Sequence, residues 1–216
     1  MKNTNPFLLP MTMMLLVLLS CQQNDGPLTP REYRLFVESQ DNGLVQSQQV
    51  GELVYHCRYL PASYQALQEM NFAPKDSVAF AQVRKNYEGH HYLLLQIRAS
   101  QRGKSLQAIY EKNPESTSWT EVSNHLNFQA RKHFQLQNEN RALSCSLYQA
   151  FPGISPSDGL SFILIFKDDA KATNAKEREE MRLTFQDDHL SKQLISFTFA
   201  KEHLSNIPPL KSLDSI

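Results

Sequence analysis

The sequence lacks the short motifs that carry common enzymatic and cofactor chemistry. It contains no HExxH metalloprotease motif, no CxxC pair, no GxGxxG dinucleotide fingerprint and no Walker loop. We therefore expect neither a bound cofactor nor a metal ion. The 22 Lys and Arg residues balance the 22 Asp and Glu residues, and no run of like charges reaches five residues. Nucleic acid is not expected as a partner, because its binding needs a basic stripe or patch.

Internal repeats are also absent, which argues against a solenoid or a propeller. The one near match to a catalytic motif is GISPS at residues 153–157, where a nucleophile elbow would require glycine at the last position. Pro156 follows the candidate nucleophile Ser155 directly. We therefore interpret this segment as a Pro/Gly/Ser turn between two strands.

The N-terminal residues have the pattern of an export signal. Lys2 is the only charge before an apolar block at residues 11–19. A short apolar block behind a basic start is typical of a secretory signal peptide, and it falls short of the ~20 apolar residues of a membrane-spanning helix. Residues 1–20 are therefore predicted to be a signal peptide.

The end of this block resembles the lipobox of bacterial lipoproteins. Leu18, Leu19 and Ser20 precede Cys21. The resemblance implies that Cys21 receives a diacylglycerol group, becomes the first residue of the mature chain and is acylated again at its new amine. Because each buried CH₂ of an acyl chain adds about 0.8 kcal/mol, three chains would anchor the protein durably in a membrane.

The segment after the cysteine is polar and contains two prolines, so residues 21–30 are expected to form the lipidated N-terminus and a tether. Gln22 stands where enteric lipoproteins retained in the inner membrane carry aspartate, which by that resemblance favours the outer membrane. Loss of Lys2 with the signal peptide leaves 21 basic and 22 acidic residues, a net charge of −1.

Two cysteines remain after Cys21 is set aside. Cys57 and Cys145 each lie in an alternating apolar pattern, Cys57 with Leu53 and Tyr55, and Cys145 with Leu143 and Leu147. Side chains two apart share one face of a strand, so both thiols are expected to point inward. In an oxidising envelope they could form a disulfide, and two buried free thiols are the alternative.

The mature chain is predicted to consist mainly of strands, closing with a tail at residues 211–216. The expected strands cover residues 32–39, 44–50, 52–60, 90–99, 125–129, 133–137, 141–151, 160–168, 181–187 and 193–200. Asp41-Asn42-Gly43 is a strong signal for a hairpin turn. The segment SFILIF, apolar on both faces, predicts a central strand that is covered on both sides. Residues 103–113 could form a short helix or a strand.

A short helical insertion is expected at residues 62–88, with Asp76 or Ser77 as an N-cap and Gly89 just past its end. Strands in this number, without alternating helices, predict a mainly β (α+β) fold. We expect residues 31–210 to form one antiparallel two-sheet β-sandwich with that insertion.

Histidines and aspartates supply the remaining candidate site residues. The adjacent His90 and His91 should point to opposite faces of a strand, and a metal site would need them joined by His56, His125 or His133. The pairs Asp168-Asp169 and Asp187-Asp188 follow strands, where ordinary turn chemistry is the simplest interpretation and carboxylate catalysis the alternative. Among the aromatic residues, Trp119, Tyr87, Tyr92 and Tyr110 are candidates for ligand contacts, and Phe128, Phe134, Phe162 and Phe166 are expected in the core.

Two longer stretches resemble small uncharacterised lipoproteins of Bacteroidetes, namely FVESQDNGLVQSQQVGELVYHCRYLPASYQAL and LSFILIFKDD…LTFQDD…ISFTFAKEHLSNIPPL. No activity follows from this resemblance. Our first hypothesis is a non-enzymatic, membrane-anchored module that binds or scaffolds an envelope protein or glycan. The second is an envelope hydrolase that acts on glycan or peptide through carboxylate and His residues at strand ends. A carrier of hydrophobic ligands is the third, and it requires a wide internal cavity.

Overall fold

The fold is mainly β, with one long sheet and several short helices. The computed structural model describes residues 26–112, 118–150, 159–168 and 180–212. In these residues eight strands form one antiparallel sheet in the order β1-β2-β3-β6-β5-β4-β7-β8. The strands are β1 (Val45–Val50), β2 (Leu53–Leu60), β3 (His90–Ala99), β4 (Phe134–Asn138), β5 (Arg141–Ala150), β6 (Leu160–Lys167), β7 (Glu180–Asp187) and β8 (Gln193–Ala200). The helices are α1 (Pro30–Glu38), α2 (Ala62–Glu69), α3 (Ser77–Lys85), α4 (Leu106–Tyr110), α5 (Trp119–Phe128), the 3₁₀ helix η1 (Ala130–His133) and α6 (Lys201–Ser205).

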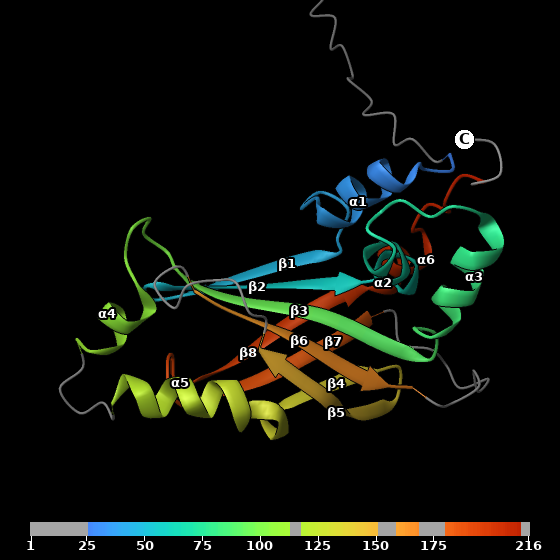
Figure 1. The fold of residues 1–216 in the computed structure, drawn as a ribbon. Helices are drawn as coiled ribbons and strands as arrows, with labels where there is room; N and C mark the ends of the chain where they lie inside the picture. The colour runs from blue at the N-terminus through green and yellow to red at the C-terminus, as the bar shows by residue number, and fades with distance from the viewer. Residues whose placement is uncertain (1–25, 113–117, 151–158, 169–179, 213–216) are drawn as a thin grey trace, which may run out of the picture.

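The sheet curls on itself and is nearly a barrel (Figure 1). The two terminal strands, β1 and β8, come together, and the Ser196 N–H on β8 donates to Gln48 Oε1 on β1 at 3.2 Å. The expectation of a two-sheet sandwich is therefore wrong. In a sandwich the hydrogen-bonded ladder breaks into two sheets, whereas here β5 pairs with both β6 and β4 and keeps the ladder continuous.

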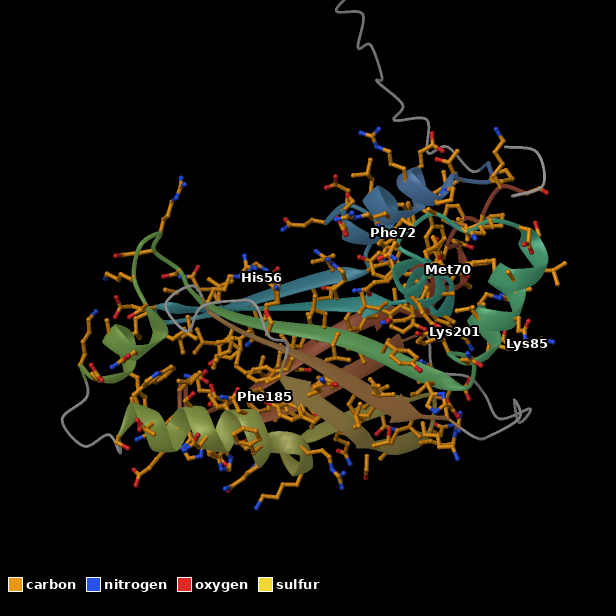
Figure 2. All side chains as sticks on the ribbon, in the orientation of Figure 1. His56, Met70, Phe72, Lys85, Phe185 and Lys201 are labelled. Carbon is orange, nitrogen blue, oxygen red and sulfur yellow. The ribbon has the colours of Figure 1, made fainter. Side chains whose placement is uncertain are left out.

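Apolar side chains fill the interior of the barrel. The largest fully buried ones are aromatic and include Phe185, which Figure 2 labels. Phe134 stacks on Phe185 with ring centroids 4.4 Å apart. Val122 and Leu126 of α5 belong to the same core. A hydrophobic ligand inside the barrel would have to displace these side chains, so the interior gives a carrier function no support.

A second core lies outside the sheet, beneath α1 and α2. Tyr33 and Val37 of α1 pack there together with Leu67 of α2. The outward side chains Ile163 and Ile165 of β6 join this layer, while alternate residues of β6 are buried inside the barrel. The prediction that SFILIF forms a central strand covered on both faces is confirmed.

Two segments predicted as strands are helices instead. Residues 32–39 lie mostly in α1, which begins with Thr29 as N-cap, Pro30 at its first position and Glu32 completing a capping box. Residues 125–129 lie at the end of α5, which Ser118 and Glu121 cap in the same way. Each box satisfies free backbone N–H groups at a helix start and contributes about 1 kcal/mol, which favours the helix over an extended chain.

Of the remaining local predictions, the helical ones are confirmed and one turn prediction is wrong. The helical insertion is present as α2 and α3, with Asp76 capping α3 through a 2.7 Å bond from the Ala79 N–H. Residues 103–113 contain the short helix α4. The turn at Asp41–Gly43 exists, but it joins α1 to β1, so the predicted hairpin there is wrong. Leu28 pairs with the C-terminal Leu210, and the described fold thus includes residues from the expected tether.

A β-bulge in β5 changes which residues face inward. Cys145 is buried, and the register with β6 shifts between Cys145 and Leu147. Tyr148 then takes the inward direction and stacks on Phe134 and Phe162. The predicted inward position of Leu147 is wrong because the bulge inserts an extra residue, which leaves this side chain 47% exposed.

Both cysteines of the domain are free thiols in the structure. Cys57 lies on β2 and Cys145 on β5, with β3 and β6 between them. Burial raises the pKa of the Cys145 thiol to about 11, and it also raises the pKa of Cys57. This is the second of the two arrangements considered above, in which the thiols pack as small apolar groups.

A buried carboxylate joins the two ends of the sheet. Asp187, only 1% exposed, accepts the Tyr55 hydroxyl at 2.5 Å, and Tyr55 lies on β2. It also accepts the backbone N–H groups of residues 189–191 and the Ser191 hydroxyl, at 2.8–3.1 Å. Burial and the charge of Asp187 raise the pKa of Tyr55, so the phenol keeps its proton and donates.

Replacing Tyr55 by phenylalanine tests this contact, because the ring stays and only the donor is lost. We expect the free energy of unfolding in urea to fall by about 1.5–3 kcal/mol, the range for a hydrogen bond to a charged group. The matched control is Tyr87→Phe, which removes an exposed 2.5 Å bond to Glu69 and should cost about 0.5 kcal/mol or less. Equal losses in the two variants would contradict a special role for Tyr55.

Candidate functional site

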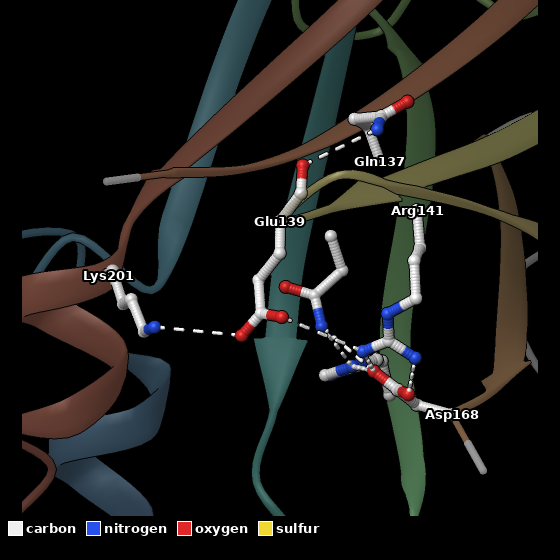
Figure 3. Close-up of polar contacts among 7 residues, drawn as sticks. Gln137, Glu139, Arg141, Asp168 and Lys201 are labelled. Carbon is white, nitrogen blue, oxygen red and sulfur yellow. Dashed lines mark hydrogen bonds and ion pairs between the residues drawn. The ribbon is translucent and has the colours of Figure 1, made fainter. Parts of the chain in front are cut away.

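A polar cluster at one end of the barrel contains two of the predicted site residues, His91 and Asp168 (Figure 3). His91 lies at the start of β3, and Asp168 follows β6 directly. The antiparallel register places His91 opposite Phe166, so both lie at the same sheet end. Asn138 at the end of β4 and Arg141 at the start of β5 complete the cluster from the neighbouring hairpin.

Asp168 is the common acceptor of this cluster. Its Oδ2 accepts from His91 Nε2 at 3.2 Å, Asn138 Nδ2 at 2.9 Å and Arg141 Nη2 at 3.0 Å. Arg141 Nη1 donates to Oδ1, which makes the arginine contact bidentate. Burial opposes ionisation of this carboxyl, but the donors outweigh it and lower the pKa of Asp168 to about 2.

Glu139 extends the cluster from the tip of the β4–β5 turn. Its φ of +55° lies in the left-handed region, which non-glycine residues seldom adopt. Its carboxylate lies 3.6 Å from Lys201 Nζ and 3.9 Å from Arg141 Nη2, while its carbonyl accepts from Gln137 Nε2 at 3.4 Å (Figure 3). The cluster thus joins the ends of β3, β4, β5, β6 and β8.

His91 is the one member with acid–base potential near neutral pH. Burial lowers the pKa of His91 and so favours the neutral ring, although Asp168 acts in the opposite direction. A neutral imidazole oriented by a carboxylate is a common general base. However, Nδ1 of His91 is buried and has no hydrogen-bond partner among the described residues. A substrate outside the barrel therefore has no direct access to this nitrogen.

The other candidate histidines and aspartates lie outside the Asp168 cluster and make separate contacts. His90 points away from His91, as expected, and its Nδ1 lies 3.0 Å from the Glu88 carbonyl oxygen. His56 contacts Ser47 Oγ at 2.7 Å. Asp187 confirms the turn interpretation, because it caps the turn after β7. Asp169 and Ser155 lie outside the described residues, as does the lipidation candidate Cys21.

Three histidines meet near the end of α5. The ring centroid of His125 lies 5.4 Å from that of His133 and 4.2 Å from that of His189, and His133 Nδ1 lies 3.4 Å from Asp188 Oδ2. His189 joins the two histidines predicted from the sequence because it lies in the turn directly after Asp187 and Asp188. No group of three His, Cys, Asp or Glu side chains within the described ranges is arranged to hold a metal ion.

An open groove lies where α5 and η1 approach β5. Its volume is about 360 Å³, and its lining residues are Phe128, Gln129, Arg131, Lys132, Leu147 and Tyr148. Phe128 is 78% exposed although it was expected in the core, whereas Phe134, Phe162 and Phe166 are buried as expected. The reason is the secondary structure: Phe128 ends the helix α5, and its neighbours Leu126 and Ala130 take the buried positions.

The remaining candidate aromatics make contacts within the domain. Tyr110 and Trp119 lie with ring centroids 6.0 Å apart, and both pack against the barrel core. Tyr87 and Tyr92 meet edge to face at 5.6 Å. These contacts within the domain explain the positions of the four aromatic side chains, and no ligand is needed to explain them.

Comparisons with known proteins add little to this geometry. No family model matches the chain, and no curated protein matches it. A protein of unknown function from Burkholderia pseudomallei has a similar structure with 11% identity and a TM-score of 0.38, covering 87% of this chain and 98% of its own. A DUF4426 family protein from Pseudomonas aeruginosa has 10% identity and a TM-score of 0.33, covering 72% and 91% respectively. No helix in the described part of the chain is long and apolar enough to cross a membrane.

The Asp168 cluster predicts an acid-dependent loss of stability. Because folding lowers the pKa of Asp168 from 3.8 to about 2, its contribution is present above pH ~4 and is lost as the pH falls through ~2. We expect Asp168→Asn to lower the free energy of unfolding by roughly 2 kcal/mol at neutral pH, with a smaller difference near pH 2.

Urea unfolding at several pH values would measure this difference. The control is Asp41→Asn in the α1–β1 turn, where the side chain is exposed and the change should stay within about 0.5 kcal/mol. A difference between wild type and Asp168→Asn that stayed constant down to pH ~2 would argue against an ionised, hydrogen-bonded Asp168.

Proposed function

We propose that this protein is a membrane-anchored envelope lipoprotein whose barrel domain binds another envelope component without catalysing a reaction. The observation that carries the proposal is the groove beside α5, in which the exposed Phe128 and Leu147 lie next to Arg131 and Lys132. Exposed apolar side chains that adjoin in one groove are typical of interaction sites.

The lipobox-like residues support the anchor. Leu28 is held by hydrogen bonds to the C-terminal segment, from its N–H to the Pro209 carbonyl at 2.9 Å and from the Lys211 N–H to its own carbonyl at 2.8 Å. Leu28 follows Cys21 by only seven positions, a distance that an extended chain spans with at most about 25 Å. A lipid on Cys21 would therefore hold the α1 side of the domain close to the membrane.

The position of the groove suits a partner in front of the membrane. Figure 1 shows α1 and the C-terminal segment on one side of the barrel, and α5 on the opposite side. A domain of this length is roughly 40 Å across. A tether of about 25 Å would thus keep the groove away from the bilayer and open to other envelope components.

The hydrolase alternative depends on the contact between His91 and Asp168. Their arrangement resembles an oriented general base, but Nδ1 of His91 faces the interior, and Asp168 is engaged by Arg141 and Asn138. This favours a role for the cluster in holding strand ends together, and it leaves the groove as the better candidate for function.

The anchor is tested by changing its attachment residue. Cys21→Ala removes the thiol that lipidation requires, so we expect the protein to move from the washed membrane fraction to the soluble envelope fraction. Quantitative immunoblotting of both fractions measures the shift. Continued sedimentation with washed membranes would refute the lipid anchor, and Cys57→Ala serves as a control that keeps Cys21.

The binding role is tested by site-specific photocrosslinking in intact cells. A photoreactive phenylalanine analogue at position 128 should give a defined heavier adduct, whereas the same analogue at Val78 of α3, which is also 78% exposed, should not. An adduct from Val78 or Leu194 alone would retain a binding role but move it away from the groove. The absence of adducts at all three positions, under conditions that trap a control complex, would contradict the proposed function.

A further inference from the structure

The groove beside α5 combines an apolar surface with a basic rim. We propose that it receives a short acidic segment of a partner protein, whose large apolar side chain packs between Phe128 and Leu147 and whose carboxylates lie beside Arg131 and Lys132. This inference rests on the proposed binding function and adds the chemistry of the partner. Its evidence comes from the bulge, from the end of α5 and from the unpaired basic groups.

The bulge in β5 is what brings Leu147 to the surface. Cys145 and Tyr148 point inward on either side of it, while Ser146 and Leu147 both lie outside. A regular strand would have buried Leu147 and exposed Tyr148. Bulges often occur next to functional sites, where they redirect a side chain. Here the bulge places an aliphatic side chain in the same groove as Phe128.

The exposure of Phe128 has no explanation in the packing of α5. The helix already contributes Val122 and Leu126 to the barrel core, and Ala130 follows with 1% exposure. Phe128 is left with 78% of its surface in water. Single exposed apolar residues are common, but Phe128 and Leu147 line one groove together.

The two basic side chains of the groove are placed to form ion pairs with an acidic partner. Arg131 Nη1 donates to the Ser146 carbonyl oxygen at 3.4 Å, which positions the guanidinium over the open side of β5. The ion pairs found among the described residues include neither Arg131 nor Lys132. Both side chains are exposed, so an acidic partner would gain contacts without first breaking a salt bridge.

Other occupants fit less well. A small anionic ligand would leave most of Phe128 in water, whereas ligand pockets usually bury most of the ligand surface. A two-fold dimer through this groove would bring Arg131 and Lys132 against their own copies. An anionic bilayer lies on the side of α1, beyond the reach of the groove if the tether is as short as proposed.

The test is a selection from a displayed library of random short peptides on the purified full-length protein in zwitterionic nanodiscs. We expect enrichment of peptides in which Asp or Glu flanks Phe, Trp or Leu. The groove variant, Phe128→Ser with Lys132→Glu, should bind the enriched peptides about ten-fold more weakly by fluorescence anisotropy. The control variant, Val78→Ser with Lys85→Glu on α3, makes an equivalent pair of changes at another place on the surface and should bind like wild type (Lys85 is labelled in Figure 2).

Several results would overturn the inference. They are no enrichment, equal binding of enriched peptides by the groove variant, variant-sensitive binding to phosphatidylglycerol vesicles alone, or self-association that the groove variant abolishes. Urea midpoints equal to that of wild type would establish that the fold is intact in both variants. This result is expected because both replaced positions in the groove are exposed. Loss of this inference would leave the proposed function standing if photocrosslinks form at position 128, Val78 or Leu194.

Discussion

The structure depends on a carboxylate that water cannot reach. Asp187 is buried between the turn after β7 and the β2 residue Tyr55, and a buried charge is tolerated only when donors replace its hydration. Its five donors come from the β7–β8 turn and from β2, elements near opposite ends of the sheet order. The need to satisfy this one group therefore favours the curled sheet over a flat one, because only the curled sheet brings Tyr55 within reach.

Closure has a consequence for the rest of the molecule. Once β1 and β8 come together, the two edge strands of the sheet face each other, and its interior is occupied by aromatic and aliphatic side chains. The polar cluster around Asp168 does at one barrel end what Asp187 does elsewhere, since Asn138 at the end of β4 contacts Asp168 after β6 and His91 on β3, strands that the ladder does not pair with β4. At the surface, the groove beside α5 combines a hollow shape with the exposed Phe128 and Leu147 and with two basic side chains that make no ion pair among the described residues.

The strand pattern was largely predictable because it depends on alternation alone. β8 follows directly from its period-two pattern, and β6 with its two-sided burial follows from its continuous apolar run. The two helical segments that were wrongly predicted as strands do carry a sequence signal for a helix start. Thr29 with Glu32, and Ser118 with Glu121, have the capping-box spacing, which outweighs the weak alternation of the residues that follow. Curling of the sheet was not predictable, because the contact of Tyr55 with Asp187 joins residues distant in sequence.

The groove was hidden from the sequence for a different physical reason. Phe128 and Leu147 both obey an apolar pattern that would bury them in regular strands. One lies on a helix and the other beyond a bulge, and each of these departures moves its side chain to the surface. In the sequence, Gln149 stands where the alternation of Leu143, Cys145 and Leu147 would place another apolar residue, which is a sign of an irregular strand but does not reveal which residue is displaced. Residues that satisfy the pattern for the core and yet face water are the ones whose exposure needs a reason, and a shared groove with a basic rim supplies one.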